Sequence, residues 1–289
     1  MERISFRDQI SRNKWKSFFL MFVIFSVIVF FGYIISFAFA SGFFFVIMSI
    51  SIIFSMFYLW ISYYNSGRIA IASVGAKEAS RSSHKQFYDL VEGLIIASGL
   101  PMPKLYIMQS PQINAFASGR NPENAVVCVT TGTLEKLDKR ELEGVLAHEL
   151  GHVANYDIKY MTLVVTMVGI IAIASEIFLR SLWFHNGNDN KNWIFVVAGI
   201  AMAILAPIFV QLVQMAISRK REFTADATAV MFTRYPQGLI GALKKIKNEN
   251  YVEKKVAKAV APLFFSNPLK NLASTHPPLE DRIKVLEKM

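Results

Sequence analysis

Long runs of apolar residues dominate the hydrophobic pattern of this chain. Four of them approach or exceed the length of about 20 helical residues that spans a bilayer. They lie near residues 18–40, 43–61, 160–182 and 193–217. Only Ser41 and Gly42 separate the first two runs, and a short polar connection separates the last two. The first run is too long for the apolar core of a signal peptide. We therefore expect four transmembrane helices, arranged as two hairpins.

Shorter segments after the first hairpin predict a small β-sheet. Residues 114–119 and 125–131 are predicted strands, because the valines of the second segment favour β structure. A further short strand is predicted within 100–107, where an apolar stretch follows two prolines.

Helical patterns surround these strands. Residues 66–98 are amphipathic and predict a helix. Another helix is predicted to begin at Asp138, because Glu141 three residues later completes a capping box. Two more helices are predicted at 236–249 and 278–288.

The charges orient the chain in a membrane. The sequence has 289 residues, of which 53% are hydrophobic, and a formal net charge of +10. Lysine and arginine flank the apolar runs, as in residues 3–16 before the first and 219–221 after the fourth. Both termini and residues 65–157 are therefore predicted to be cytoplasmic by the positive-inside rule. The basic residues do not gather with aromatic ones, so no nucleic-acid partner is expected.

Two single residues bear on compartment and membrane function. Cys128 is the one cysteine, which excludes an internal disulfide, agrees with a reducing cytoplasmic location and is interpreted as a strand packing residue. Glu176 lies inside the third apolar run. It is either a functional intramembrane acid or a residue near the outer, hydrated end of a tilted helix.

The segment from His148 to His152 is an HExxH sequence in a helical context. Residues four apart share one helix face, so the two imidazoles can bind the same metal ion. Glu149 is held beside them, where it can activate the attacking water. This pattern predicts the core of a zinc metalloprotease.

A catalytic zinc site requires a third protein ligand, and Glu222 is the best candidate. Asp226 lies four residues later and is predicted to accept the N–H of a ligand histidine. On spacing alone, a solvated Glu/Asp face is equally compatible with this pair. The topology favours the site, because His152 and Glu222 lie roughly 12 Å and 8 Å from the ends of the third and fourth spans.

The predicted fold class is thus a mainly α membrane protein: four transmembrane helices with a cytoplasmic zinc-peptidase domain, built from the HExxH helix and a small β-sheet. The chain divides into an N-terminal arm with the first hairpin (1–64), a peptidase part with the HExxH helix (65–157), the second hairpin (158–218) and a second peptidase part with the third ligand (219–289).

The chain resembles the HtpX-type membrane zinc metallopeptidases, the group that also contains the CAAX prenyl proteases. The matching stretches are 113–119, 127–132, 148–155, 218–227 and 275–283, which include HELGH, REFTAD and THPPLEDRI. One departure is Tyr156, which stands where a basic residue is expected. Because Tyr156 is not a predicted ligand, this change is not expected to affect catalysis.

The resemblance implies that His148, His152 and Glu222 bind one Zn²⁺ per subunit. Glu149 would act as the general base and then donate a proton to the leaving amine. It also implies a multi-pass protein of the bacterial cell membrane that acts in stress response and protein quality control.

Further roles follow from the same resemblance. His276 would stabilise the tetrahedral intermediate, assisted by Arg282. Asn114 would contact substrate near the metal, and the strand with Val127 and Val129 would be the edge strand that pairs with an extended substrate. Taken alone, His276 is compatible with a capping residue, Arg282 with a surface ion pair to Glu280 or Asp281, and Asn114 with a turn.

The leading functional prediction is a membrane-anchored zinc endopeptidase that cleaves misfolded membrane proteins or unfolded polypeptides. One alternative is a prenyl-peptide processing protease, although those relatives have more spans. Another is a non-catalytic metal-binding scaffold or transporter, which would not require Glu149. The sequence makes no prediction of oligomeric state or of individual substrates.

Overall fold

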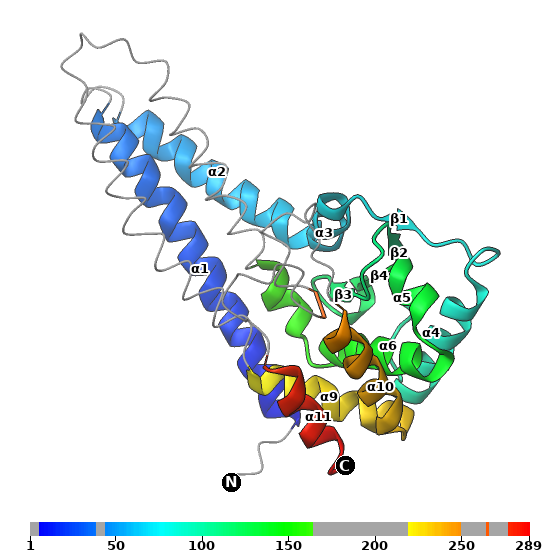
Figure 1. The fold of residues 1–289 in the computed structure, drawn as a ribbon. Coiled ribbons are helices and arrows are strands. Elements are labelled where there is room, and N and C mark those ends of the chain that lie inside the picture. Colours follow the sequence, from blue (N-terminus) through cyan, green and yellow to red (C-terminus); the bar gives the residue numbers. More distant parts are fainter. Residues whose placement is uncertain (1–5, 39–43, 164–218, 250–263, 266–276) are drawn as a thin grey trace.

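The structure is a computed structural model that describes residues 6–38, 44–163, 219–249, 264–265 and 277–289. Its two longest helices, α1 (Phe6–Ala38) and α2 (Phe44–Tyr64), pack along each other and project from a rounder part of the molecule (Figure 1). Gly32 of α1 lies against Ser51 of α2, and an added methyl group there would overlap this serine. The third and fourth predicted spans and Glu176 lie outside the described residues, apart from the first few residues of span three.

The α2 helix has the character of a membrane span. Among the described residues it is the one helix identified as long and apolar enough to cross a bilayer. Its outward side chains are large and apolar, with Phe45 81% and Ile53 66% exposed. Such a continuous apolar surface suits lipid rather than water.

Basic and aromatic side chains join the hairpin to the rounder part. In each case a cationic group lies over an aromatic ring, a contact that is favourable where it is shielded from water. The three pairs are Lys14 with Tyr156, Lys159 with Tyr63, and Arg120 with Tyr64. Tyr156 stands where a basic residue is expected, and its ring is contacted by Lys14 of α1.

The rounder part contains a four-stranded sheet in the order β1-β2-β4-β3. Its strands are β1 (Lys77–Glu78), β2 (Lys104–Met108), β3 (Ala115–Ser118) and β4 (Val126–Thr130). The β2 and β4 strands are parallel, and the outer strands are antiparallel to their neighbours. The predicted strands at 100–107, 114–119 and 125–131 are therefore confirmed.

The prediction that residues 125–131 form an edge strand is wrong. The β4 strand lies between β2 and β3, so both of its edges are paired. Val127 and Val129 are fully buried in the core and present no side chain to a substrate. The outer strand beside the HExxH helix is β3. Whether a strand lies at the edge of a sheet depends on which distant segments pair with it. Here β2 pairs with β4 on the side opposite β3.

The prediction of one helix over 66–98 is also only partly right. The structure has α3 (Ser66–Val74), then β1, then α4 (Lys85–Ser98). Gly75 has a φ of 64°, the left-handed conformation that ends helices and that glycine adopts readily. Residues 77–78 then pair with β2, so tertiary pairing interrupts the amphipathic pattern.

Helices pack on and around this sheet. The HExxH helix is α6 (Lys139–Ala154), and it begins at Asp138 with the predicted capping box to Glu141. It contacts α4, α10, β3 and α9 (Arg219–Thr233). The predicted C-terminal helices are α10 (Pro236–Asn248) and α11 (Leu279–Leu286), and short helical turns η2 (Pro122–Asn124) and α5 (Thr131–Lys136) flank β4.

The crossing of α6 and α10 depends on glycine. A methyl group on Gly144 would lie 2.5 Å from the backbone N and 2.8 Å from the Cα of Leu239, which is rigid backbone of α10. Opposite it, Gly238 lies against the carbonyl of Arg140. The two helix backbones can approach this closely only where side chains are absent.

We therefore expect Gly144→Ala to destabilise the protein by about 1–3 kcal/mol, because the helices must separate to fit the methyl group. Gly93→Ala is the matched control: it lies in the exposed interior of α4 with nothing near its added carbon, and should stabilise by roughly 0.5–1 kcal/mol. Thermal unfolding in detergent measures both, and an unchanged midpoint for Gly144→Ala would contradict the proposed close packing.

Candidate metal centre

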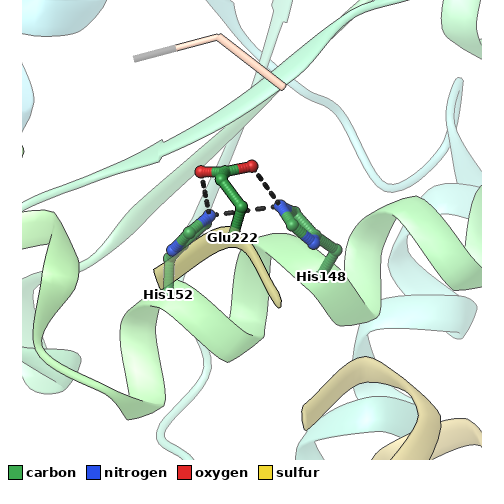
Figure 2. Close-up of side chains that lie close together, drawn as sticks. All are labelled: His148, His152 and Glu222. Carbon is green, nitrogen blue, oxygen red and sulfur yellow. Dashed lines mark hydrogen bonds and ion pairs between the residues drawn. The ribbon is translucent and has the colours of Figure 1, made fainter. Parts of the chain in front are cut away.

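The candidate metal site forms where α6 crosses α9. Gly151 of the HExxH segment has no side chain, and an added methyl group would lie 3.1 Å from the carbonyl oxygen of Ala225. This close approach places Glu222, in the first turn of α9, opposite the histidine face of α6. Figure 2 shows the Glu222 carboxylate above the imidazoles of His148 and His152.

The distances among the three side chains fit a metal site. The Nε2 atoms of His148 and His152 are 3.1 Å apart, and the Glu222 oxygens lie 3.7 Å and 3.6 Å from them. Ligands of a tetrahedral zinc ion lie about 3.3 Å apart, given bonds of about 2.0–2.1 Å. Two imidazole nitrogens and one carboxylate oxygen are also a donor set typical of catalytic zinc. The predicted ligands therefore converge, and this set fits the ion.

A buried ionic network holds His148. Its Nδ1 donates to Asp226 across 2.8 Å, as predicted for this aspartate. Arg282, from α11, donates to both oxygens of Asp226 at 2.9 Å and 2.6 Å. A bidentate pair of this kind sets the orientation of the carboxylate as well as its charge. The imidazole is therefore held in the tautomer that points Nε2 toward Glu222.

Arg282 is not a surface residue. It is fully buried, and its Nη1 lies 3.4 Å from the Glu222 carboxylate, so the alternative of a surface ion pair to Glu280 or Asp281 is wrong. The guanidinium contacts two carboxylates of the site from behind His148. Arg282 of the C-terminal helix therefore contacts both the HExxH and the REFTAD segments.

The network sets the charges of its members. Burial, reinforced by the positive charge of Arg282, lowers the pKa of His148 to about 4, which keeps the imidazole neutral. Burial alone would raise the pKa of Asp226, but Arg282 and the hydrogen bond from His148 outweigh it and hold that pKa below its ordinary value. A neutral imidazole beside a charged carboxylate is the arrangement that a metal ligand requires.

Asp157 supports the second histidine, and sequence reasoning missed this role. Its Oδ2 lies 3.1 Å from Nδ1 of His152, and its side chain is buried. Burial opposes the charge of His152, but the hydrogen bond to Asp157 and the nearby carboxylates raise the pKa of His152 to about 9. The available signal was an acid five residues after the second histidine, just beyond the helix end at Asn155.

Glu149 lies between the metal ligands and the sheet. It is buried, and the nearby backbone amide of Ala117 in β3 favours its charged form. Burial raises the pKa of Glu149 to about 7. A carboxylate with a pKa near neutrality can both accept and return a proton, the property required of a general base that later acts as an acid.

Of the two remaining predicted site residues, Asn114 is among the described residues and His276 is not. Asn114 is buried directly before β3, where its backbone N–H lies 3.1 Å and 2.7 Å from the hydroxyl oxygens of Thr130 and Thr133. It therefore stands at the start of the outer strand, where its backbone is bonded to residues at and just after the end of β4. His276 lies outside the described residues.

Comparisons with known proteins agree with this geometry. The model of peptidase family M48 matches residues 81–289. A protein named protease HtpX homolog from Dictyoglomus thermophilum is 40% identical and covers 100% of this chain and 96% of its own. A homolog of the same name from Caldanaerobacter subterraneus subsp. tengcongensis is 42% identical, over 82% of this chain and 83% of its own.

A solved structure shares the fold. The crystal structure of Ste24p from S. mikatae superposes with a TM-score of 0.51 at 18% identity. The similarity covers 96% of this chain and 66% of that longer one, so this chain spans slightly less than two thirds of Ste24p. With the family match over most of its length and relatives at about 40% identity, the chain belongs to peptidase family M48.

Proposed function

We propose that this M48 metalloprotease is an integral-membrane zinc endopeptidase that hydrolyses misfolded membrane proteins or unfolded polypeptides at the cytoplasmic membrane face. The observation that supports it best is the convergence of His148, His152 and Glu222, with their donor atoms all within 4.8 Å of one another. Glu149 extends from the same helix turn as the two histidines. A metal site and a general base are thus combined beside a strand edge.

The residues of the site divide the work of hydrolysis. Bound zinc supplies Lewis-acid chemistry, which polarises a carbonyl group and makes water more acidic. Glu149 removes a proton from the attacking water and transfers it to the leaving amine. Asp226 and Asp157 each hold one ligand histidine in orientation. Arg282 acts through Asp226 and Glu222, so we assign it a positioning role.

The substrate contacts are part of the same proposal. We assign stabilisation of the tetrahedral intermediate to His276, whose segment leads directly into α11. Asn114 would contact substrate at the start of β3. Backbone pairing along β3 rather than β4 would bind an extended substrate with little dependence on its side chains, which suits a broad-specificity protease.

The proposed membrane arrangement has four spans, the domain division given above, and both termini and the active site in the cytoplasm. The cation–aromatic pairs support it, since Lys14 of α1 and Tyr63 and Tyr64 of α2 all contact the peptidase part. Both of those hairpin ends therefore lie on the peptidase side. A site at this position would meet polypeptides emerging from the bilayer.

The two alternative functions are less well supported. The likeness to Ste24p concerns the fold alone, and the predicted four spans would enclose a smaller chamber than a protein with more spans. A metal-binding scaffold has no need of a general base, yet Glu149 is buried beside the ligands with a pKa near 7.

We expect Glu149→Gln to keep zinc but lower peptide hydrolysis by at least about 100-fold, because the amide cannot accept a proton. Cleavage of casein by the detergent-solubilised protein, with and without chelator, measures activity. Bound zinc is quantified separately. The matched control is Glu143→Gln, a glutamate on the outer face of the same helix that pairs with Arg140. Retained cleavage by Glu149→Gln would contradict its role.

Asp157→Asn is expected to weaken zinc binding about 10- to 100-fold, because the amide no longer fixes His152 as strongly. Competition with a chromophoric chelator reports this without any activity assay. Asp89→Asn, an exposed acid on α4, serves as the control. Unaltered zinc affinity in Asp157→Asn would show that His152 is oriented by other contacts.

A further inference from the structure

Two groups from outside the sheet lie against the outer edge of β3: the backbone of Phe265 and the carboxylate of Glu149. Residues 115 and 117 have the same orientation along the strand, since backbone groups alternate with a period of two. The carbonyl of Ala115 accepts a hydrogen bond of 2.7 Å from the backbone N–H of Phe265. The backbone amide of Ala117 lies near the Glu149 carboxylate and favours its charged form. The edge is thus bonded at Ala115 to a residue 150 positions further along the chain, and two residues later it faces the proposed general base.

Phe265 also reaches the metal ligands through its ring. The ring meets the imidazole of His148 edge-on, with centroids 4.8 Å apart. The guanidinium of Arg282 lies 4.7 Å from the same ring. Phe265 is 2% exposed, so its side chain is enclosed by its neighbours.

The preceding residue supports the same position. Phe264 packs against Phe116 of β3, with ring centroids 5.1 Å apart, and is 1% exposed. Successive side chains of the dipeptide therefore point to different surroundings, one toward the sheet and one toward the metal ligands. Residues 264–265 are the short orange stretch beside β3 in Figure 1, and one backbone hydrogen bond joins Phe265 to the strand edge.

We propose that Phe265 occupies the position of one substrate residue, and that a polypeptide substrate with a large apolar side chain must displace it. This inference rests on the proposed peptidase function. An extended substrate that pairs with β3 must donate a backbone N–H to an outward carbonyl. The carbonyl of Ala115 faces outward and lies two residues before Ala117, whose amide is near Glu149. Phe265 makes the bond to this carbonyl with its own N–H.

Two consequences follow for binding. The apparent affinity for substrate is reduced by the fraction of molecules in which Phe265 covers the edge. A substrate residue that replaces Phe265 finds a space shaped for an aromatic ring beside His148 and Arg282. Peptides with phenylalanine or a similar apolar residue should therefore compete best, and peptides of small polar residues poorly.

The test uses the full-length, zinc-loaded protein in detergent with the Glu149→Gln change, which prevents turnover. The probe is a short fluorescein-labelled peptide of glycine, serine and lysine with one central phenylalanine, and binding is followed by fluorescence anisotropy. Phe265→Pro removes the N–H donor, and Phe265→Ala removes the ring. Phe87→Ala removes an equally buried phenylalanine from α4 and is the matched control.

We expect both Phe265 variants to bind the peptide about tenfold more tightly, with unchanged zinc content and no gain for Phe87→Ala. Equal or weaker binding by folded Phe265 variants would overturn the proposal and make Phe265 a fixed wall of the fold. If no variant binds the peptide and none with Glu149 restored cleaves casein, the peptidase function itself fails. Binding to the parent without a gain in the variants rejects this inference alone.

A second measurement avoids dependence on the stability of those variants. Phe265→Cys introduces one thiol that becomes accessible only when the segment is displaced, while the native Cys128 stays buried in β4 with its pKa raised by burial. Displacement predicts faster alkylation of the introduced thiol at saturating peptide than without peptide. Alkylation that stays constant or slows would contradict displacement.

Discussion

The close crossing of α6 and α9 is the constraint on which the rest of the site depends. At Gly151 the two backbones are so close that an added methyl group would lie 3.1 Å from the carbonyl oxygen of Ala225, which is tighter than an ordinary contact. The result is that Glu222 and Asp226, one helical turn apart, meet the same face of α6 that carries His148 and His152. A larger residue at this crossing would push α9 away from α6 and so move the carboxylate away from the imidazoles.

This crossing also gathers several ionisable groups in a buried place. An isolated buried charge is strongly unfavourable, whereas paired and hydrogen-bonded charges are tolerated. The guanidinium of Arg282 contacts both Asp226 and Glu222 and so compensates their negative charges. Burial keeps His148 neutral. Because Arg282 belongs to α11, the site is complete only when the C-terminal helix has packed.

In the proposed mechanism, strand β3 links the metal site to substrate. Its outward amide at Ala117 lies near Glu149, so the proposed general base and the edge proposed to bind a polypeptide belong to neighbouring elements. The same edge accepts Phe265. The membrane hairpin contacts the peptidase part through cations over tyrosine rings, which keeps the site near the end of α2.

The sequence by itself determined what depends on neighbours within a few residues. Four such local features are present in the structure: the spacing of His148 and His152, the capping box at Asp138, the strand at 126–130 and the apolar length of α2. Glu222 and Asp226 could be proposed because their spacing is also helical, although that spacing alone was equally compatible with a solvated face.

Only the tertiary structure decided what depends on distant partners. It put β4 inside the sheet rather than at its edge, interrupted 66–98 by pairing residues 77–78 with β2, and buried Arg282 against Asp226. It also assigned Asp157 to His152 and Phe265 to the edge of β3. Hydrogen-bond edges and buried charges are satisfied by whichever residues the fold brings near, and no local periodicity encodes that choice.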